Sequence, residues 1–530
     1  MKNRKSRFSM VLVLTLVAIM LLSGCGSGGG TAGTTGATNA TSASGQSAGG
    51  DTAAKSLYGN IDLSKPYTVN LYVLGDIPQD TETVVSEINK ILEPQYNTKL
   101  ELKFLAWSDY QTKYGLVLAS GDAVDLMTTA PWCYYYTESA KGAFMEITDE
   151  FLGKAMPQTK KTQAPESWNS AKINGKIYAV PMNVIQPMSK YVAIRDDLRE
   201  KYGLPALTDW TSLENFLVAI AEKETPASGI YGVFSSKRNA EFEYIWQQQY
   251  ELIPIFFDSF WYPYNGGAKP KAEDIFLYWD SKYFRDFAAR MKYLGDKGVW
   301  SQDALTNSIS PNDAFANGQG ACIAWNGTVF RYGKLAEDNL KVKVGYYDLT
   351  KDKLATAENY NNNMIAVCSA SKSPDRAGMI LDLLKNDTAL YRLFVGGIEG
   401  KHYILADDAR SLGPDADKYP WDAFSWGVRR DDLLRPNDLD PRRIAIEDNQ
   451  KEHMKLPPTN GFNFDQQPVK SEMAAVNSIR DEYLGMLELG KVDNVNGTID
   501  EMVSRMKKAG IDKIKDELLN QYQTWLSANP

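Results

Sequence analysis

Hydrophobic and polar positions divide the chain into three parts. An apolar run of 13 residues, Met10–Leu22, lies near the start. Residues 26–56 are mostly Gly, Ser, Thr and Ala, a composition that buries too little apolar surface to form a fold. From Tyr67 onward, hydrophobic residues return with regular spacing. The sequence therefore predicts a flexible tether followed by a folded region.

The first part of the folded region alternates between strand and helix patterns. Val69, Leu71 and Val73 alternate with polar residues, which predicts a strand with one buried face. Ser108 and Gln111 have the spacing of a capping box at the start of a helix. Strands that alternate with helices of this length predict βαβ units in a mostly parallel sheet. The predicted strands cover 69–73, 100–104 and 125–128, and the predicted helices cover 81–92 and 108–118.

Two tryptophans follow predicted strand ends. Trp107 comes after the strand at 100–104, and Trp132 comes after the strand at 125–128. Ligands of open α/β sheets bind in the crevice beyond the carboxyl ends of the strands. We therefore expect both indoles to line one crevice.

A third group of rings lies just before a proline and a pair of glycines. Aromatic residues are dense over 238–283, and most of them fit a helix that buries its rings. Trp261 and Tyr262 differ, because Pro263 and the glycine pair 266–267 predict a loop. Exposed aromatic residues on loops commonly take part in binding, so these two rings are predicted to contact a ligand.

Two further tryptophans and the last helix complete the pattern. Trp325 follows the apolar run 321–324 and marks another strand end. Trp426 lies in 405–470, a stretch rich in Asp, Arg, Pro and Trp that the pattern assigns to neither helix nor strand. One last helix is predicted from Thr498 to Trp525, with an apolar stripe typical of packing against a core.

Composition and cysteine usage place the folded region among globular proteins. The chain is 43% hydrophobic, 11% aromatic and 23% charged, and no second apolar stretch reaches membrane length. Cys133, Cys322 and Cys368 are odd in number and lack CxxC spacing. We expect all three to be buried small hydrophobic residues, with a Cys322–Cys368 disulfide as the alternative.

The start of the chain has the parts of a secretory signal peptide. Four basic residues among the first seven precede the apolar run, and Leu22-Ser23-Gly24-Cys25 ends it. This ending resembles the lipobox of bacterial lipoproteins, which implies a signal peptide over 1–24 and lipidation of Cys25, with palmitate among the acyl chains. An ordinary signal peptide or a transmembrane helix is the alternative, but a span needs roughly 20 apolar residues.

Loss of the leader makes the mature chain more acidic. It removes four of the 58 basic residues and leaves 54 against 66 acidic ones, so the net charge falls from −8 to −12. This argues against nucleic acid as a partner, because nucleic acid binds basic surfaces. Membrane attachment then depends on the lipid.

Several segments of the folded region share a recognisable order and spacing. They are Gly121–Leu126, Asn174–Pro181, Arg195–Leu198, Lys201–Pro205, Trp210–Glu214, Phe315–Ala321 and Met506–Lys513. Together with the lipobox and the tether, they resemble the extracellular solute-binding proteins of ATP-driven (ABC) importers, a group that includes oligosaccharide receptors. The last of these segments resembles the lipoprotein-like branch from Gram-positive bacteria.

The resemblance implies an α/β fold of the type II periplasmic-binding-protein kind, with two lobes joined by hinge strands. It implies a lipidated tether over 25–65, a first lobe over 66–182 plus 307–368, and a second lobe over 183–306 plus 369–530. Asn174-Gly175 independently predicts a hairpin that leads into a strand ending at Pro181. The hinge is then expected either at 181–183 or at 186–187.

The resemblance also implies a function. The protein would capture an oligosaccharide by hinge closure and deliver it to the permease of an ABC transporter. It would act as a monomer, lipid-anchored at the extracellular face of a bacterial cell membrane, without a cofactor or metal.

Carbohydrate chemistry selects the candidate site residues. Sugar rings stack on indole and phenol rings, while their hydroxyls pair with carboxylate, amide or guanidinium groups. Trp107 lies beside Asp109, and Trp426 lies near Asp422 and Arg429. Each ring taken alone fits a core, and only the set predicts an aromatic cleft. The predicted ligand-binding residues are Trp107, Asp109, Trp132, Tyr135, Trp261, Tyr262, Trp325 and Trp426.

Catalytic motifs are absent from the sequence. His402 and His453 lie 51 residues apart, and the chain has no HExxH, GxSxG, P-loop or Cys/His metal cluster. The sequence therefore predicts a binding protein and no catalytic residue. A tethered glycoside hydrolase is the enzyme alternative, because such enzymes combine aromatic subsites with two carboxylates. A receptor of the same fold for peptides or small metabolites is a third hypothesis.

Overall fold

The computed structural model describes residues 57–529 except 122, 257–258, 407–408 and 431–438. The predicted signal peptide, Cys25 and most of the tether lie outside the described residues. No helix within the described ranges has the length and hydrophobicity to span a membrane.

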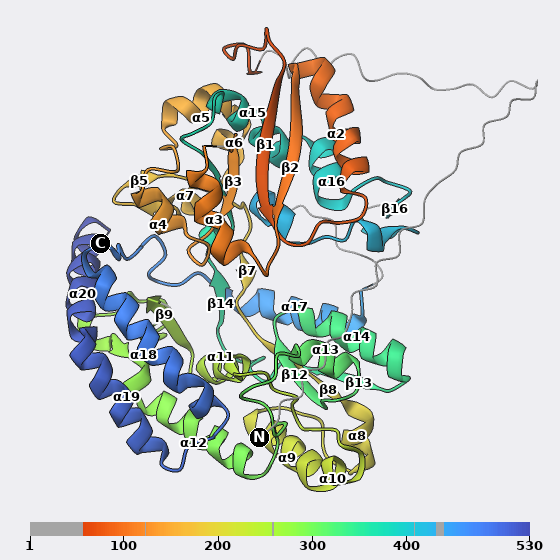
Figure 1. The fold of residues 1–530 in the computed structure, drawn as a ribbon, viewed down its shortest axis with the longest axis vertical. Coiled ribbons are helices and arrows are strands. Elements are labelled where there is room, and N and C mark those ends of the chain that lie inside the picture. The colour runs from red at the N-terminus through yellow and green to blue at the C-terminus, as the bar shows by residue number, and fades with distance from the viewer. Residues whose placement is uncertain (1–56, 122, 257–258, 407–408, 431–438, 530) are drawn as a thin grey trace, which may run out of the picture. The chain divides into compact units, whose positions relative to one another are not determined.

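A five-stranded sheet in the order β2-β1-β3-β15-β6 forms the centre of the first lobe, at the top of Figure 1. β1 pairs in parallel with β2 and β3, and β15 pairs antiparallel with β3 and β6. The predicted strands and their parallel pairing near the start of the folded region are confirmed. The strands are β1 (Tyr67–Leu74), β2 (Thr98–Leu105), β3 (Leu126–Thr129), β6 (Val180–Pro181) and β15 (Met364–Val367).

Helices cover both faces of this sheet. Both faces carry buried apolar side chains, because successive residues of a strand point to opposite sides. Leu126 and Ile365 pack in one hydrophobic cluster, and Met127 and Met364 pack in another. A short hairpin, β4 (Lys172–Ile173) and β5 (Lys176–Ile177), confirms the predicted turn. The helices are α2 (Thr81–Tyr96), α3 (Tyr110–Ala119), α4 (Tyr135–Ala140), α5 (Asp149–Ala155), α6 (Pro157–Thr162), α7 (Pro165–Ser170), α15 (Pro374–Asn386) and α16 (Thr388–Gly396).

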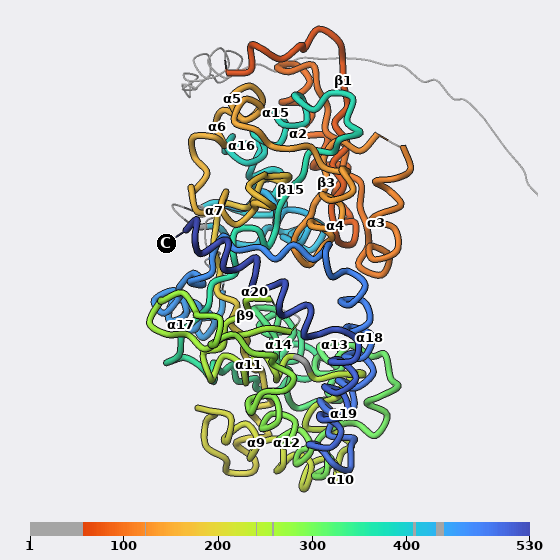
Figure 2. Tube along the Cα trace, turned by 90° about the vertical axis from the view of Figure 1, so that its left-hand side faces the viewer, coloured from red at the N-terminus to blue at the C-terminus, as the bar shows by residue number. Residues whose placement is uncertain are grey.

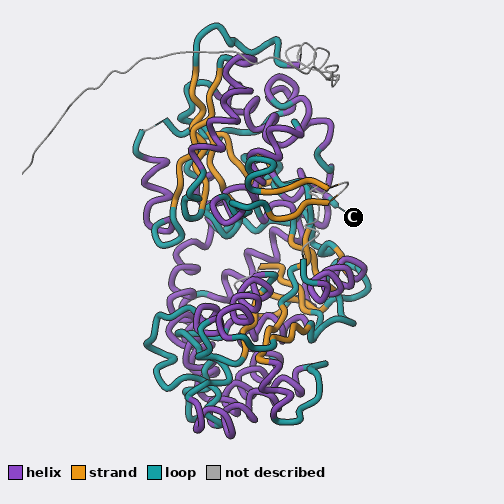
Figure 3. The backbone as a smooth tube through the Cα atoms, turned by 90° about the vertical axis from the view of Figure 1, so that its right-hand side faces the viewer, coloured by secondary structure: helices purple, strands orange, loops and turns teal. Residues whose placement is uncertain are grey.

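The second lobe contains two three-stranded antiparallel sheets, β12-β8-β13 and β11-β10-β9. The strands are β8 (Tyr191–Arg195), β9 (Leu252–Phe256), β10 (Phe260–Pro263), β11 (Phe276–Leu277), β12 (Cys322–Trp325) and β13 (Val344–Tyr347). The helices between them are α8 (Asp196–Lys201), α9 (Trp210–Ala219), α10 (Thr225–Ser228), α11 (Ala240–Gln249), α12 (Lys282–Asp296), α13 (Pro311–Ala316) and α14 (Thr328–Leu340). Figure 3 shows the two groups of strands, each surrounded by helices.

The strand pairing differs from the expected lobe boundaries. Of the segment 307–368, β12 and β13 pair with β8 of the second lobe, and only β15 pairs in the first sheet. α15 and α16 then pack on the first lobe, although the sequence placed them in the second. Local patterns predict that a strand exists, whereas its pairing partner depends on contacts between residues far apart in the chain.

Three helices at the C-terminus pack on the second lobe (Figure 2). They are α18 (Lys470–Glu488), α19 (Val495–Ala509) and α20 (Ile511–Ala528). The single last helix that the sequence predicted is two helices, because Gly510 has a φ of 104° and ends α19. The apolar stripe lies in the core as predicted, through Met506, Ile514 and Tyr522.

All three described cysteines are free and buried, as expected from their spacing. Cys322 lies in β12 of the second lobe, while Cys368 follows β15 of the first. Their backbones belong to different sheets, so the alternative disulfide does not form.

A small sheet in the order β18-β14-β7 connects separate passages of the chain between the lobes (Figure 1). β14 (Ala355–Glu358) pairs antiparallel with β7 (Gln186–Pro187) and parallel with β18 (Met454–Lys455), which follows α17 (Pro441–His453). Of the two predicted hinge positions, Gln186-Pro187 therefore lies in the connecting sheet. Pro181 belongs to β6 of the first sheet.

A further link between the lobes, residues 459–465, is called the strap below. Phe464 is buried in the core of the second lobe, where its ring packs against Phe256. Next to it, the Asn463 amide donates to the carbonyl oxygens of Ser170 and Lys172 at 3.0 and 2.8 Å. The Tyr136 hydroxyl donates to the Asn463 amide oxygen at 2.8 Å. The strap thus anchors in one lobe and bonds to the other.

We expect Asn463→Ala to lower the free energy of unfolding by about 1–3 kcal/mol, because a typical hydrogen bond contributes about 0.5–1.5 kcal/mol. Urea denaturation followed by circular dichroism measures this change. Asn520→Ala, at an exposed position of α20, is the matched control and should change stability by less than about 0.5 kcal/mol. Equal effects of the two substitutions would contradict a stabilising role for the strap.

Candidate functional site

Three tryptophans from distant parts of the chain meet at the end of the first sheet. The ring centroid of Trp107 lies 6.2 Å from that of Trp132 and 6.2 Å from that of Trp426, with interplanar angles of 34° and 44°. Trp107 and Trp132 each expose 38% of their surface, and Trp426 is half-buried. These three rings are called the tryptophan surface.

Strand ends and one short helix position the tryptophan surface. Trp107 follows β2 and Trp132 follows β3, the two parallel neighbours of β1, as the sequence predicted. Trp426 lies in η6 (Ala423–Val428), a 3₁₀ helix that contacts the end of β1. The Trp132 indole N–H donates to the Asn362 carbonyl at 2.7 Å, which fixes the ring. The rings are therefore held in place while part of each stays accessible.

Hydrogen-bonded polar side chains of the connecting segments adjoin this surface and are called the crossing network. The Gln186 amide and the Asn362 amide donate to the same Glu358 carboxylate oxygen, at 2.5 and 2.6 Å. The Arg429 guanidinium donates to the Gln186 amide oxygen at 2.6 Å and lies 4.7 Å from the ring centroid of Trp421. Since Asn362 also accepts the Trp132 N–H, the network and the rings form one continuous region.

A second aromatic group lies in the second lobe, at the end of β12. The Lys190 ammonium is 5.1 Å from the ring centroid of Trp325 and 5.4 Å from that of Tyr244. Lys190 is buried, and burial lowers its pKa, although Glu358 and Glu241 act in the opposite direction. Trp325 and Glu241 both line a cavity of ≈ 300 Å³. Burial raises the pKa of Glu241 to about 7.

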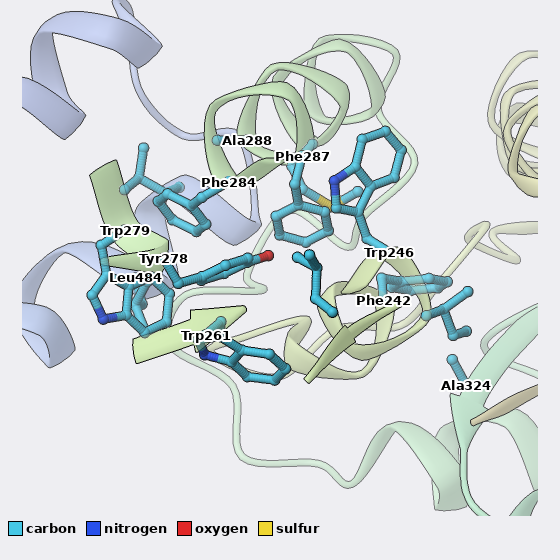
Figure 4. Packing of buried hydrophobic residues seen from close by; sticks show 14 of the residues in the cluster. Phe242, Trp246, Trp261, Tyr278, Trp279, Phe284, Phe287, Ala288, Ala324 and Leu484 are labelled. Carbon is cyan, nitrogen blue, oxygen red and sulfur yellow. The ribbon is translucent and has the colours of Figure 1, made fainter. Parts of the chain in front are cut away.

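Three of the predicted ligand-binding residues lie in the protein core. Trp261 and Tyr262 expose 3% and 1%, because 260–263 form strand β10 between β9 and β11 instead of a loop. Figure 4 shows Trp261 packed near Tyr278 and Trp279. The glycine pair that suggested a loop follows the strand and leaves the two rings inside.

The third of these residues, Tyr135, is fully buried, and its hydroxyl donates to the Ala171 carbonyl at 2.6 Å. It begins α4, whose inner face packs against the first sheet. Asp109 is half-buried two residues after Trp107, and its carboxylate forms an ion pair with Lys113 at 2.7 Å. The structure therefore brings together Trp107, Trp132 and Trp426, with Trp325 in a separate group.

Sequence reasoning missed most of the polar residues around the rings. Gln186 was identified only as a hinge position, and Arg429 only as a neighbour of Trp426. Glu358 and Asn362 lie in an ordinary acidic and amide-rich stretch that carries no motif. Lys190 had no signal at all, because a single lysine before a strand is common. Only the pairing of β7 with β14 brings these side chains together.

Within the described ranges, no group of three or more His, Cys, Asp or Glu side chains is arranged to hold a metal ion.

Comparison with known proteins decides the family. The sequence pattern of the bacterial extracellular solute-binding proteins matches residues 79–389, more than half of the chain. The chain belongs to this family. A second pattern, a domain of unknown function (DUF3502), matches residues 458–527. This range contains the whole strap and, except for Ala528, the three C-terminal helices of this solute-binding protein.

Similar proteins match this chain over nearly its whole length. The chain is 24% identical over 505 residues to a carbohydrate ABC transporter substrate-binding protein of Streptococcus pneumoniae, which covers 90% of this chain and 96% of the relative. The solved structure of NgtS, an N-glycan transport solute-binding protein of S. pneumoniae in complex with Man1GlcNAc, has a TM-score of 0.67 at 20% identity. That match covers 87% of this chain and all of the other.

An ABC-transporter-associated solute-binding protein of Bifidobacterium longum infantis, described as binding HMO, has a TM-score of 0.66 at 14% identity. The match covers 87% of this chain and 99% of the other. These structures confirm the two-lobe α/β fold of the type II periplasmic-binding-protein kind.

The different positions of Trp261 and Trp107 predict different effects of their removal. Trp261→Ala empties a volume in the core and should lower the free energy of unfolding by about 3–5 kcal/mol. Trp107→Ala removes a ring that is already partly hydrated, so it should lower the free energy of unfolding by clearly less. Urea denaturation of both variants measures the difference, and equal losses would be inconsistent with the positions of the two rings.

Proposed function

We propose that this solute-binding protein captures an oligosaccharide on the tryptophan surface and delivers it to the permease of an ABC importer. The observation that carries the proposal is the meeting of three partly exposed indoles with the crossing network. Exposed tryptophans are costly to hydrate, and three that share one surface indicate a ligand with apolar faces. Sugar rings have such faces on their C–H sides, and their hydroxyls match the nearby amide, carboxylate and guanidinium groups.

The named ligands of similar proteins support the carbohydrate class. The relative with 24% identity is a carbohydrate ABC transporter substrate-binding protein, and NgtS binds Man1GlcNAc. We extend this ligand class to the present chain because its tryptophan surface has the matching chemistry.

Closure of the two lobes is the proposed mode of capture. The crossing network joins Gln186 on β7 to Glu358 on β14, and both strands belong to the sheet between the lobes. A ligand on the tryptophan surface therefore contacts side chains that move with the hinge. Differential contact with the open and closed forms shifts the population toward the closed form, which a permease recognises. The protein then acts by binding and release, without catalysis.

Isothermal titration calorimetry against a panel of neutral and acidic oligosaccharides, including Man1GlcNAc and Man5GlcNAc, tests the function. We expect saturable binding, with the glycans recovered unchanged by chromatography. New reducing ends in the recovered mixtures would identify a glycoside hydrolase instead. Heat released by peptides but by none of the glycans would identify a peptide receptor.

Loss of a ring should weaken glycan binding without unfolding the protein. Trp426→Ala and Trp107→Ala each remove one stacking partner, and an aromatic contact contributes about 0.5–1.5 kcal/mol beyond its buried area. With the lost apolar area included, we expect a roughly tenfold to hundredfold increase in Kd. Trp525→Ala, a ring of α20 outside this region, is the control and should leave Kd unchanged. Unchanged affinity in both site variants would place the glycan elsewhere.

We also propose that the receptor is a monomer anchored at the extracellular face of the membrane. A lipid on Cys25 holds it there, and residues 25–65 form the tether. The support for this anchoring is the lipobox-like sequence and the acidic mature chain, which offers no polybasic patch to a membrane. Cys25→Ser should move the protein from the membrane fraction to the culture medium, as measured by immunoblotting. Retention of the variant in the membrane fraction would indicate an uncleaved transmembrane leader.

A further inference from the structure

The cavity in the second lobe has features that the tryptophan surface does not use. Its volume is ≈ 300 Å³, at the lower end of the range for small-molecule sites. Phe242, Pro311 and Trp325 form apolar walls, and Asn239, Glu241 and Asn312 supply polar groups. A cavity with one indole wall and several polar groups has the composition of a sugar subsite.

Two of these polar groups bond no other side chain among the described residues. The Asn312 amide is half-buried, and the Glu241 carboxylate accepts a hydrogen bond from its own backbone N–H. Asn239 differs, because its side chain already bonds Ser235 and the Glu488 backbone. Asn312 and Glu241 therefore keep donor or acceptor capacity toward the cavity. A hydroxylated ligand would satisfy both.

Lys190 contacts Trp325, one of the residues that line the cavity. Its ammonium lies over the rings of Trp325 and Tyr244, and it is buried without an ion pair among the described residues. A cation held over an aromatic ring restricts the ring's rotation. Lys190 therefore acts as a positioning residue that presents Trp325 to the cavity.

Electrostatic contact connects this cavity to the crossing network. Glu358 and Glu241 both influence Lys190 electrostatically, and both favour its charged form. Glu358 is bonded to Asn362, which holds Trp132. Lys190 therefore responds both to the crossing network and to the cavity wall.

We infer that the cavity beside Trp325 is a second subsite that takes one uncharged pyranose ring at the end of the captured oligosaccharide. This inference rests on the proposed function. Trp325 stacks on the ring, the Glu241 carboxylate accepts from its hydroxyls, and the Asn312 amide both donates and accepts. The ring is uncharged, because the residues that line the cavity include one carboxylate, Glu241, and no lysine or arginine that could pair with an acidic substituent. The two lobes then hold different rings of one glycan.

Calorimetry of the mature protein with the same panel, including Man1GlcNAc and Man5GlcNAc, tests the subsite. We expect Asn312→Ala to raise the Kd of the bound neutral glycans roughly threefold to tenfold, the effect of losing one or two hydrogen bonds. Glu241→Gln should raise it by a similar factor, because it replaces one carboxylate oxygen with an amide group that cannot accept. Asn520→Ala on α20 is the control and should leave Kd unchanged. Thermal denaturation checks that all three variants fold.

The outcomes separate the subsite from the proposed function. If the wild-type protein binds no glycan of the panel, the carbohydrate function is wrong and the subsite falls with it. If the wild-type protein binds glycans and both variants match Asn520→Ala, only the subsite is overturned. Tighter binding of acidic than of neutral glycans would contradict the assignment of an uncharged ring.

Discussion

One carboxylate, Glu358, organises the region between the two lobes. It accepts hydrogen bonds from Gln186 on the neighbouring strand and from Asn362 four residues ahead, and it influences the buried Lys190. Removing it would leave two amides without their acceptor, and unpaired polar groups of this kind cost more than the bonds contribute when made. The position of Glu358 in turn depends on the pairing of β14 with β7. A backbone contact therefore controls the placement of the crossing network.

Sequence periodicity predicted the elements that local chemistry determines. The first three strands and first two helices of the first lobe, and the positions of Trp107 and Trp132 beyond strand ends, followed from alternation and from the geometry of parallel sheets. The meeting of Trp426 with these rings required tertiary structure, because η6 is separated from β3 by almost 300 residues and sits in a stretch without periodicity. The lobe boundaries differed for the same reason.

Trp261 and Trp107 show why composition alone does not separate binding rings from core rings. Both are followed by residues that favour turns, yet β10 lies between two other strands and Trp107 comes after the last residue of β2. An aromatic residue inside a paired strand is enclosed by its neighbours, while one just past the strand end is bounded on fewer sides. Position relative to the last paired residue is thus more informative than the local frequency of Gly and Pro.

The strap links the two lobes of the molecule. Because Phe464 is fixed in the second core and Asn463 bonds backbone carbonyls of the first lobe, separation of the lobes must break these bonds or displace the strap. Each such bond adds to the free energy of the separated form. A ligand that enters only a separated form binds with an apparent affinity reduced by the fraction of molecules in that form. Weakening a strap contact, which is remote from the tryptophan surface, would then change the apparent affinity without altering any of its three rings.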